Sequence, residues 1–443
     1  MPADRDDLLA HLDRANRTLA HSYPGDSGGR QPIHTVYGGA DLFRPDTARR
    51  LGDLALKAAA DHAPDPETLA EAVDIAVEAA ERVYSRVIDK LQSEPVEDFR
   101  LDFEDGYGNR PDEEEDGHAR SAARAVAEGL DAVTLPPFIG IRVKPLSAEL
   151  ASRSLRTLEL FLEELVERTD GALPANFVVT LPKVGAPDQV SVFSEFISRL
   201  EGSAGIPVGT VPIEIMIETT QSIFDAQGRV NVRRLVDAGE GRVKAAHFGT
   251  YDYTAACNIT AAYQHMTHPA CDFAKHVMQV SLAGTGVWMS DGSTNVLPVP
   301  IHRTEPLTES QMAENRTTIH SAWRLHFSHI QHSLVHGFYQ GWDLHPAQLV
   351  TRYAAVFDFF LGGLEAASER LRNFVDQAAQ ATLVGEVFDD AATGQGLLNY
   401  FLRAVNSGAI SEEQAAQQSS LSIEELRSRS FVGILEKRSS GSH

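Results

Sequence analysis

The chain has 443 residues, of which 43% are hydrophobic and 23% are charged. This length and composition are typical of a globular protein and exclude a disordered or fibrous chain. The formal net charge of −23 argues against nucleic acids and anionic membranes as partners, because both would be repelled, and small-molecule chemistry is favoured.

The sequence contains two cysteines, Cys257 and Cys271, and it begins with the charged segment MPADRDDLLAHLDR where a secretory leader would be apolar. No apolar run approaches the roughly 20 residues that span a bilayer. We therefore expect a cytoplasmic protein with reduced thiols.

The first elements in chain order are a helix and a linker. Leucines at near-helical spacing over residues 4–20 are followed by SYPGDSGGRQP, which predicts an N-terminal helix and linker within residues 1–32. HTVYGGADLF then reads as a strand, the Ala-rich stretch from about Pro45 to Leu91 as one long helix, and FRLDFEDGYG as the next strand with its loop.

Six more strand-like segments follow, separated by helical patterns: FIGIRVKPL, FVVTLPKV, VPIEIMIETT, VKAAHFGTYDY, TGVWMSDG and GWDLHPAQ. Eight strands alternating with helices predict an α/β fold, a (β/α)8 TIM barrel over residues 33–355. An open doubly wound sheet is the main alternative. It is disfavoured because the first strand ends in Gly38-Gly39-Ala40-Asp41 and not in a GxGxxG turn.

Residues 356–443 show helical patterns and predict a helical C-terminal extension. The patterns are FDFFLGGLEAASERLRNFVDQ, LLNYFLRAV and EEQAAQQSSLSIEELRSRSF. The last residues, SSGSH, are polar and are left out of the fold prediction.

Acidic residues stand at three strand ends: Asp102, Glu104 and Asp105 in LDFEDGYG, Glu218 in IEIMIETT, and Asp252 in HFGTYDYT. Strand ends meet at the active face of such a barrel, and Mg2+ usually takes one or two protein carboxylates. Glu218 and Asp252 are therefore the candidate ligands for Mg2+, with Mn2+ as a substitute. The first string would form an outer ring around the site. The alternative is that these acids cap helix N-termini.

Two basic residues also belong to strand ends. Arg142 in GIRVKPL could stabilise a developing oxyanion, and its permanent charge must be paired if it is buried. Lys183 in TLPKV could act similarly, or it could be a structural partner of the acidic residues.

A run of histidines, His326, His329, His332 and His336, falls on a predicted helix and could bind zinc. The helix also carries large apolar residues, so a structural role is favoured. VGEVFDDAATGQG is rich in glycine but lacks the GKS or GKT of a phosphate-binding P-loop.

From about His34 to about Arg352, the chain resembles the citrate lyase β-subunit and malyl-CoA lyase branch of the HpcH/HpaI aldolase superfamily. LDFEDGYG, with Ala119-Arg120 after it, is similar to the family's second-strand string. Further similar strings are Arg142-Val143-Lys144, Leu181-Pro182-Lys183, Ile217-Glu218-Thr219, Phe248-Gly249-Thr250-Tyr251-Asp252-Tyr253 and His345-Pro346-Ala347-Gln348. Lys144 stands where the family usually has Asn.

The resemblance implies a phosphoenolpyruvate/pyruvate-type barrel and a Mg2+-dependent carbon–carbon lyase. Its substrate would be a small-molecule carboxylate or acyl-CoA, namely a 3-hydroxy acid or its CoA thioester, and it would yield a 2-oxo acid such as glyoxylate, pyruvate or oxaloacetate. Glu218 and Asp252 would hold the metal. Catalytic candidates are Arg142, Glu104, Asp105 and Lys183, together with Asp389 and Asp390, which would act as acid or base in a neighbouring subunit. Arg142, Gly249, Thr250 and Tyr251 would bind substrate, and the family suggests a homo-oligomer, a trimer or hexamer.

Two other functions are compatible with the same barrel. A phosphotransfer enzyme would need a phosphate-contacting His or a basic cluster near the barrel mouth. A metabolite-binding barrel without catalysis would not need Arg142, Glu218 and Asp252 together.

Overall fold

The computed structural model describes residues 5–26, 29–304, 306–376, 382–384, 387–389 and 391–440. Eight parallel strands form its centre: β1 (His34–Gly39), β2 (Asp98–Asp102), β3 (Phe138–Arg142), β4 (Phe177–Leu181), β5 (Ile213–Ile217), β6 (Val243–Phe248), β7 (Trp288–Ser290) and β8 (Gly341–Asp343). All eight coincide with segments predicted as strands from the sequence.

Hydrogen bonds join the strands in the order β7-β6-β5-β4-β3-β2-β1-β8. Between β7 and β8, the amide of Trp342 donates to Gly292 O at 3.0 Å and the amide of Asp291 donates to Gln340 O at 2.8 Å. These bonds close most of the remaining gap. The sheet is therefore a nearly closed barrel, which confirms the predicted (β/α)8 fold.

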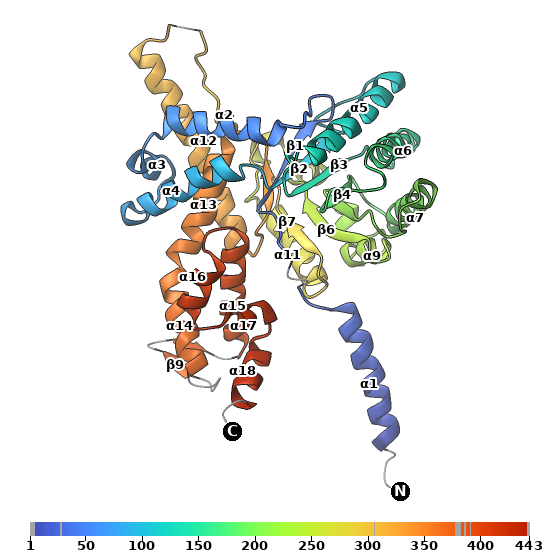
Figure 1. Cartoon of the computed structure of the whole chain (residues 1–443), viewed down its shortest axis with the longest axis vertical. Coiled ribbons are helices and arrows are strands. Elements are labelled where there is room, and N and C mark those ends of the chain that lie inside the picture. The colour runs from blue at the N-terminus through green and yellow to red at the C-terminus, as the bar shows by residue number, and fades with distance from the viewer. Residues whose placement is uncertain are drawn as a thin grey trace.

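Helices surround the strands, as Figure 1 shows. Those within the barrel region are α2 (Thr47–His62), α3 (Pro66–Val73), α4 (Val77–Ser93), α5 (Asp112–Asp131), α6 (Ala151–Arg168), α7 (Pro187–Ala204), α8 (Thr220–Ile223), α9 (Val232–Asp237), α10 (Thr250–Ala256), the short η1 (Ala261–Tyr263), α11 (Pro269–Leu282), α12 (Glu309–Val335) and α13 (Gln348–Gly362).

The prediction of one long helix from Pro45 to Leu91 was wrong, because three helices occupy this stretch. α3 begins with Pro66, which is favourable at a first helical position, and the side chain of Asp65 accepts a hydrogen bond from the amide of Thr68. It ends at Asp74, whose φ of 65° is left-handed and cannot continue a helix. Local capping therefore outweighs the helical propensity of the alanines.

The strands carry apolar and polar residues alternately, so that one set packs under the helices and the other fills the barrel. On β2, Phe99 and Leu101 are buried core residues, whereas the side chain of Arg100 hydrogen-bonds across the barrel. Arg100 donates to Thr180 Oγ1 at 3.1 Å and to Glu214 Oε2 at 2.8 Å. This polar layer links β2, β4 and β5 inside the barrel.

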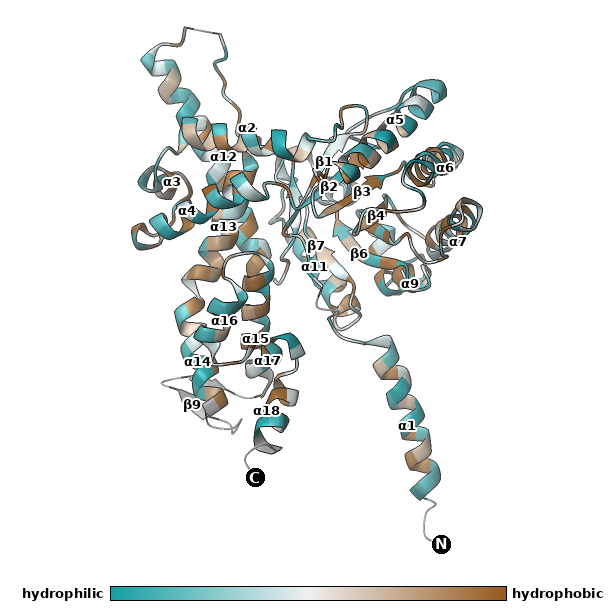
Figure 2. Ribbon diagram, in the orientation of Figure 1, coloured by the Kyte–Doolittle hydropathy of each residue, from teal (hydrophilic) through white to brown (hydrophobic). Residues whose placement is uncertain are grey.

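Two parts extend from the barrel (Figures 1 and 2). At the N-terminus, α1 (Arg5–Ser22) projects into solvent. At the C-terminus lie α14 (Leu364–Asp376), the antiparallel pair β9 (Thr382–Val384) and β10 (Val387–Asp389), α15 (Ala391–Asn406), α16 (Glu412–Ser419), α17 (Ile423–Ser428) and α18 (Phe431–Ser440). Among the described helices, none combines the length and apolar character needed to cross a bilayer.

Candidate active site

The candidate site residues gather at the carboxyl ends of neighbouring strands. Asp102 and Arg142 are the last residues of β2 and β3 and face each other in register. Lys183 lies two residues after β4, Glu218 directly after β5, and Asp252 in the first turn of α10, which follows β6. Parallel strands end at one face of a barrel, so these side chains converge although they are far apart in the sequence.

Arg142 is held by a carboxylate on the neighbouring strand. Its Nε donates to Asp102 Oδ1 at 2.7 Å and its Nη2 to Asp102 Oδ2 at 2.6 Å, a two-bond fork between buried groups. Asp102 also accepts from the amides of Glu104 and Gly106. Asp102 therefore orients Arg142, and its expected place in an outer ring around a metal stays a prediction.

An aromatic ring supports the same guanidinium. Arg142 Cζ lies 4.7 Å from the centre of the Tyr37 ring, a cation–π arrangement, and Nη1 lies 3.2 Å from Glu104 Oε2. Burial opposes the charge, but the Asp102 and Glu104 carboxylates outweigh it and raise the pKa of Arg142 above its ordinary value. Arg142 therefore carries a fixed positive charge at the barrel mouth.

Lys183 connects the acidic groups. Its Nζ forms an ion pair with Glu104 and lies 3.1 Å from Asp105 Oδ2 and 3.4 Å from Asp252 Oδ2. Burial alone would lower the pKa of Lys183, but Glu218 and Glu104 raise it. The residue has a left-handed φ of 52°, and its amide donates to Glu218 Oε1 at 2.7 Å. Such strain in a non-glycine residue costs about 1–3 kcal/mol and is often found at functional sites.

Glu218 is a buried carboxylate, and the nearby cations Lys183 and Arg142 only partly compensate its charge. Burial, and next the charge of Asp252, raise its pKa to about 8. Gly249 lies directly against it, since a Cβ at this position would be 2.5 Å from Glu218 Cβ. Only glycine, which has no side chain, therefore fits at position 249 beside Glu218.

The donor set fits a divalent metal. Five carboxylates, those of Asp102, Glu104, Asp105, Glu218 and Asp252, surround the two cations Arg142 and Lys183. A dication would relieve the excess of negative charge and the unfavourable ionisation of Glu218. Among the described residues, no group of three or more metal-ligating side chains is assembled. Glu218 and Asp252 are the two carboxylates that could hold Mg2+, which usually takes one or two protein carboxylates and completes its shell with water or substrate oxygens.

The proposed substrate-binding residues lie next to this cluster, at the start of α10. Thr250 is buried, and its Oγ1 has no hydrogen-bond partner among the described residues. The Tyr251 hydroxyl donates to Ser293 O and accepts from the amide of Asn295, both at 2.9 Å. These bonds fix the start of α10 against the loop after β7.

Other candidates lie elsewhere. Asp389 is the last residue of β10 in the C-terminal part, and nothing is described of its side chain; Asp390 lies outside the described residues.

The α12 histidines have separate partners: His326 bonds with Thr351, His329 with Thr294, His332 with Asp272, and His336 with the carbonyl of His332. They help to pack α12 and do not converge on one point.

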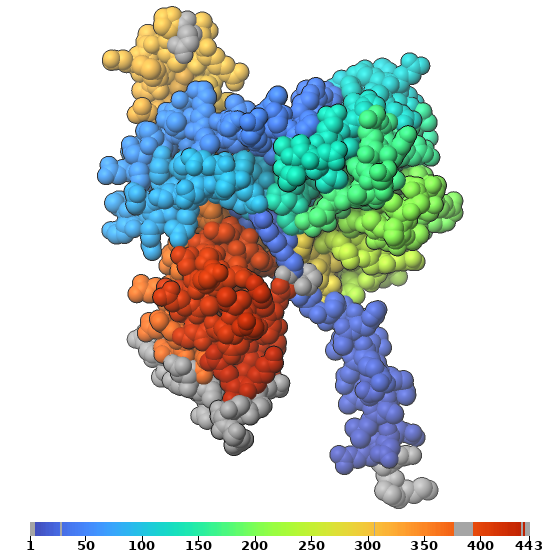
Figure 3. Space-filling view, in the orientation of Figure 1, coloured from blue at the N-terminus to red at the C-terminus, as the bar shows by residue number. Residues whose placement is uncertain are grey.

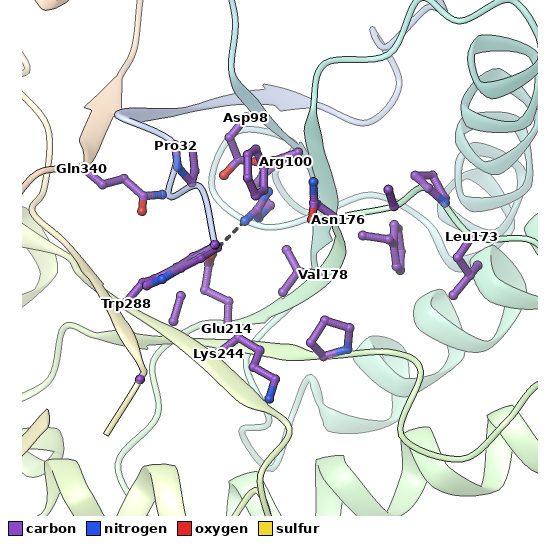
Figure 4. Close-up of a pocket in the computed structure, with 18 of the residues that line it drawn as sticks. Pro32, Asp98, Arg100, Leu173, Asn176, Val178, Glu214, Lys244, Trp288 and Gln340 are labelled. Carbon is purple, nitrogen blue, oxygen red and sulfur yellow. Dashed lines mark hydrogen bonds and ion pairs between the residues drawn. The ribbon is translucent and has the colours of Figure 1, made fainter. Parts of the chain in front are cut away.

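A cavity of about 700 Å3 lies at the opposite, amino-terminal end of the barrel. Figure 4 shows Arg100 and Glu214 there, with Trp288 and Lys244 on the wall. A smaller hollow of about 290 Å3 lies at the carboxyl ends of β1 and β8, where Tyr37 lines it, and none of the five carboxylates is among its lining residues. The larger cavity and the acidic residues therefore lie at opposite ends of the barrel.

Sequence reasoning missed Tyr37 and Trp342, which pack on each other with ring centres 4.5 Å apart beside Arg142. Both are aromatic residues on predicted strands, next to a strand that carries a candidate arginine. That signal could have identified them, but the pairing of β1 with β8 was needed to bring them together.

Comparison with solved structures finds the same fold in a citrate lyase from Burkholderia xenovorans LB400. The TM-score is 0.56 and the identity 18%, and the match covers 88% of this chain and 96% of that one. The magnesium/glyoxylate complex of Haloferax volcanii malate synthase gives a TM-score of 0.42 and 15% identity, over 92% and 97% of the two chains.

The comparison with curated proteins gives no match. A protein family described as a domain of unknown function, DUF6986, matches residues 12–434, which include the whole barrel and nearly all of the C-terminal part. The chain belongs to this DUF6986 family.

Proposed function

We propose that this protein is a Mg2+-dependent carbon–carbon lyase, which cleaves or forms an aldol-type bond in a 3-hydroxy acid or its CoA thioester and yields a 2-oxo acid. The observation that carries the proposal is the convergence of Arg142, Lys183, Glu218 and Asp252 at one end of the barrel. The citrate lyase named among the structures of the same fold is in keeping with it.

Glu218 and Asp252 would hold the metal. When bound, Mg2+ would act as a Lewis acid toward the carboxylate and adjacent oxygen of the 2-oxo acid. Gly249, Thr250 and Tyr251 would position that carboxylate, since they lie beside Glu218 at the start of α10.

In the cleavage direction, a base removes the proton of the substrate hydroxyl, the carbon–carbon bond breaks, and its electron pair forms the enolate of the second product. Asp105 is suited to take the proton, because its side chain is 62% exposed and lies beside Lys183. Arg142 is placed to stabilise the enolate oxygen, because its fork with Asp102 uses two of its five N–H groups. The enolate then takes a proton, and condensation reverses these steps.

A hollow at the carboxyl ends of β1 and β8 would give room for the extended part of a larger substrate. It is lined by Tyr37, by the apolar Leu42 and Leu344, by Arg44 and Arg50, and by His345. Apolar walls with two arginines would suit the anionic part of a thioester.

The test uses the purified full-length protein with Mg2+ and a panel of 3-hydroxy acids and their CoA thioesters, with release of 2-oxo acid as the readout. We expect turnover with Mg2+ and none with EDTA, and loss of both turnover and calorimetric Mg2+ binding in Glu218→Gln. Glu113→Gln, an exposed position on α5, serves as the matched control and should behave as the wild type. Turnover that survives EDTA or Glu218→Gln would refute the proposal.

A further inference from the structure

α1 is a helix without a partner in its own chain. All of its residues from Arg5 to His21 are exposed, and Figure 3 shows the helix projecting from the body of the molecule. Its 18 residues correspond to a length of about 27 Å. Isolated helices of this size are marginal in water, and most gain their stability by packing an apolar face against another element.

The root of the helix is fixed to the barrel. Arg233 Nη2 donates to Ser22 O at 3.3 Å, its guanidinium lies 5.1 Å from the centre of the Tyr23 ring, and the amide of Gly25 donates to Gly284 O at 2.8 Å. These contacts set the direction in which α1 leaves the barrel, so the exposed helix does not fold back onto its own body.

Four apolar residues of α1 form a stripe, which Leu9, 50% exposed, borders on one side. Leu8, Leu12, Ala15 and Leu19 follow one another at spacings of four, three and four residues, which is the spacing of a coiled-coil seam. The three leucines are 65%, 53% and 60% exposed. Such a stripe is suited to one other helix.

Two copies of this helix complement each other when they run antiparallel. Leu8 then faces Leu19 of the other copy and Leu12 faces Ala15, so that each layer of the seam is apolar. The first nine residues hold three aspartates and one arginine, whereas the last nine hold two arginines and no acidic residue. An antiparallel pair therefore joins the acidic half of one helix to the basic half of the other, and a parallel pair would join like charges.

We propose that α1 pairs antiparallel with α1 of a second copy of this chain and thereby joins two protomers, or two smaller assemblies, about a two-fold axis. The contact is self-complementary, as a two-fold interface requires. A pair of helices of this length buries less than the roughly 800 Å2 per partner of standard interfaces, so the association is reversible and depends on concentration.

Sedimentation velocity and light scattering of the full-length protein, at about 1 to 100 µM, test the pairing. Leu12→Glu places a charge in the seam and is expected to halve the mass of the assembly. Ala10→Glu introduces the same charge on the opposite face of α1 and should leave the mass unchanged. The pairing is refuted if the wild type does not associate, if Leu12→Glu keeps the wild-type mass, or if both variants dissociate equally.

Cysteine crosslinking tests the direction of the helices. In a Cys257→Ser background, Leu8→Cys and Leu19→Cys proteins are mixed and oxidised with copper–phenanthroline. Antiparallel pairing predicts a crosslink between the two different variants and little between identical ones. Efficient crosslinking of Leu8→Cys with itself would overturn the antiparallel arrangement. Since α1 is distant from the acidic cluster, neither result depends on the proposed lyase activity.

Discussion

Gly249 shows how one missing side chain shapes the candidate site. The residue directly follows β6, and its Cα packs against the buried carboxylate of Glu218, the proposed metal ligand. Its φ is within the ordinary range, so the need for glycine comes from space and not from backbone conformation.

Gly249→Ala is therefore expected to displace Glu218. The new methyl group would stand 2.5 Å from Glu218 Cβ, and the neighbouring backbone cannot yield without moving the strand end. We expect Mg2+ affinity to fall by about 10- to 100-fold, in the range seen when groups that orient a metal ligand are altered. Isothermal titration calorimetry with Mg2+ measures this directly.

Gly202→Ala provides the matched control. Gly202 lies within α7, and a Cβ there would meet no atom within 4 Å. The same substitution should stabilise the helix by roughly 0.5–1 kcal/mol and leave Mg2+ binding unchanged. Equal Mg2+ affinity in both variants would show that the close packing at Gly249 does not position Glu218.

At the scale of elements, Lys144 joins a strand, a helix and a loop. It follows β3, is buried, and its Nζ donates to Glu115 Oε2 on α5 at 2.7 Å and to Phe103 O at 2.6 Å. The lysine therefore attaches α5 and the loop after β2 to the third strand.

Lys144→Met should destabilise the protein by about 3–5 kcal/mol, because the buried Glu115 would lose its closest cationic partner. Lys57→Met is the matched control, since Lys57 forms an exposed pair with Asp61 within α2 and its loss should have little effect. Urea unfolding of both variants measures the difference. If they unfold at the same midpoint, the buried pair does not hold α5 in place.

The strands were predicted correctly from the sequence, because each is a buried apolar segment. The eight strands are short apolar runs at the centre of the molecule, and this pattern is strong in the sequence. It failed over Pro45–Leu91, where Asp65, Pro66 and Asp74 end and restart helices within an alanine-rich stretch. Capping residues of this kind are harder to recognise in a sequence than a long periodic pattern, although they decide where the helices end.

At the scale of the molecule, the C-terminal part docks on the barrel through polar contacts as well as packing. Arg403 on α15 donates to Gln31 Oε1 at 2.8 Å and to Asp26 Oδ2 at 3.0 Å, both in the segment that leads into β1. Arg86 on α4 donates to Ala409 O at 3.0 Å. The C-terminal part thus contacts both the segment before β1 and the barrel helix α4.

The buried histidine His329 links the stability of the molecule to pH. Burial, and next the neighbouring His326 and His265, lower its pKa to about 4. The unfolded chain takes up the proton near its ordinary pKa of 6.5, so the neutral, folded form loses stability as the pH falls from about 6.5 to about 4, by up to about 3 kcal/mol.

Urea unfolding at several pH values, with His329→Gln as the comparison, isolates this contribution. Glutamine keeps a polar group near Thr294, which bonds with His329 Nδ1 at 2.9 Å, but it does not titrate. The difference in unfolding free energy between wild type and variant should be constant above about pH 7 and shrink toward pH 4. A difference that does not change with pH would contradict the assignment to His329.

The sequence by itself determined the eight strands, the barrel and the positions of Arg142, Lys183, Glu218 and Asp252 at strand ends, because alternation and burial are local patterns that each segment carries. Only the tertiary structure decided what these side chains contact: the fork of Asp102 on Arg142, the ring of Tyr37 beneath it, and the space that Gly249 leaves for Glu218. These contacts join residues far apart in the chain. They depend on strand register and on how the barrel closes, which no single segment encodes.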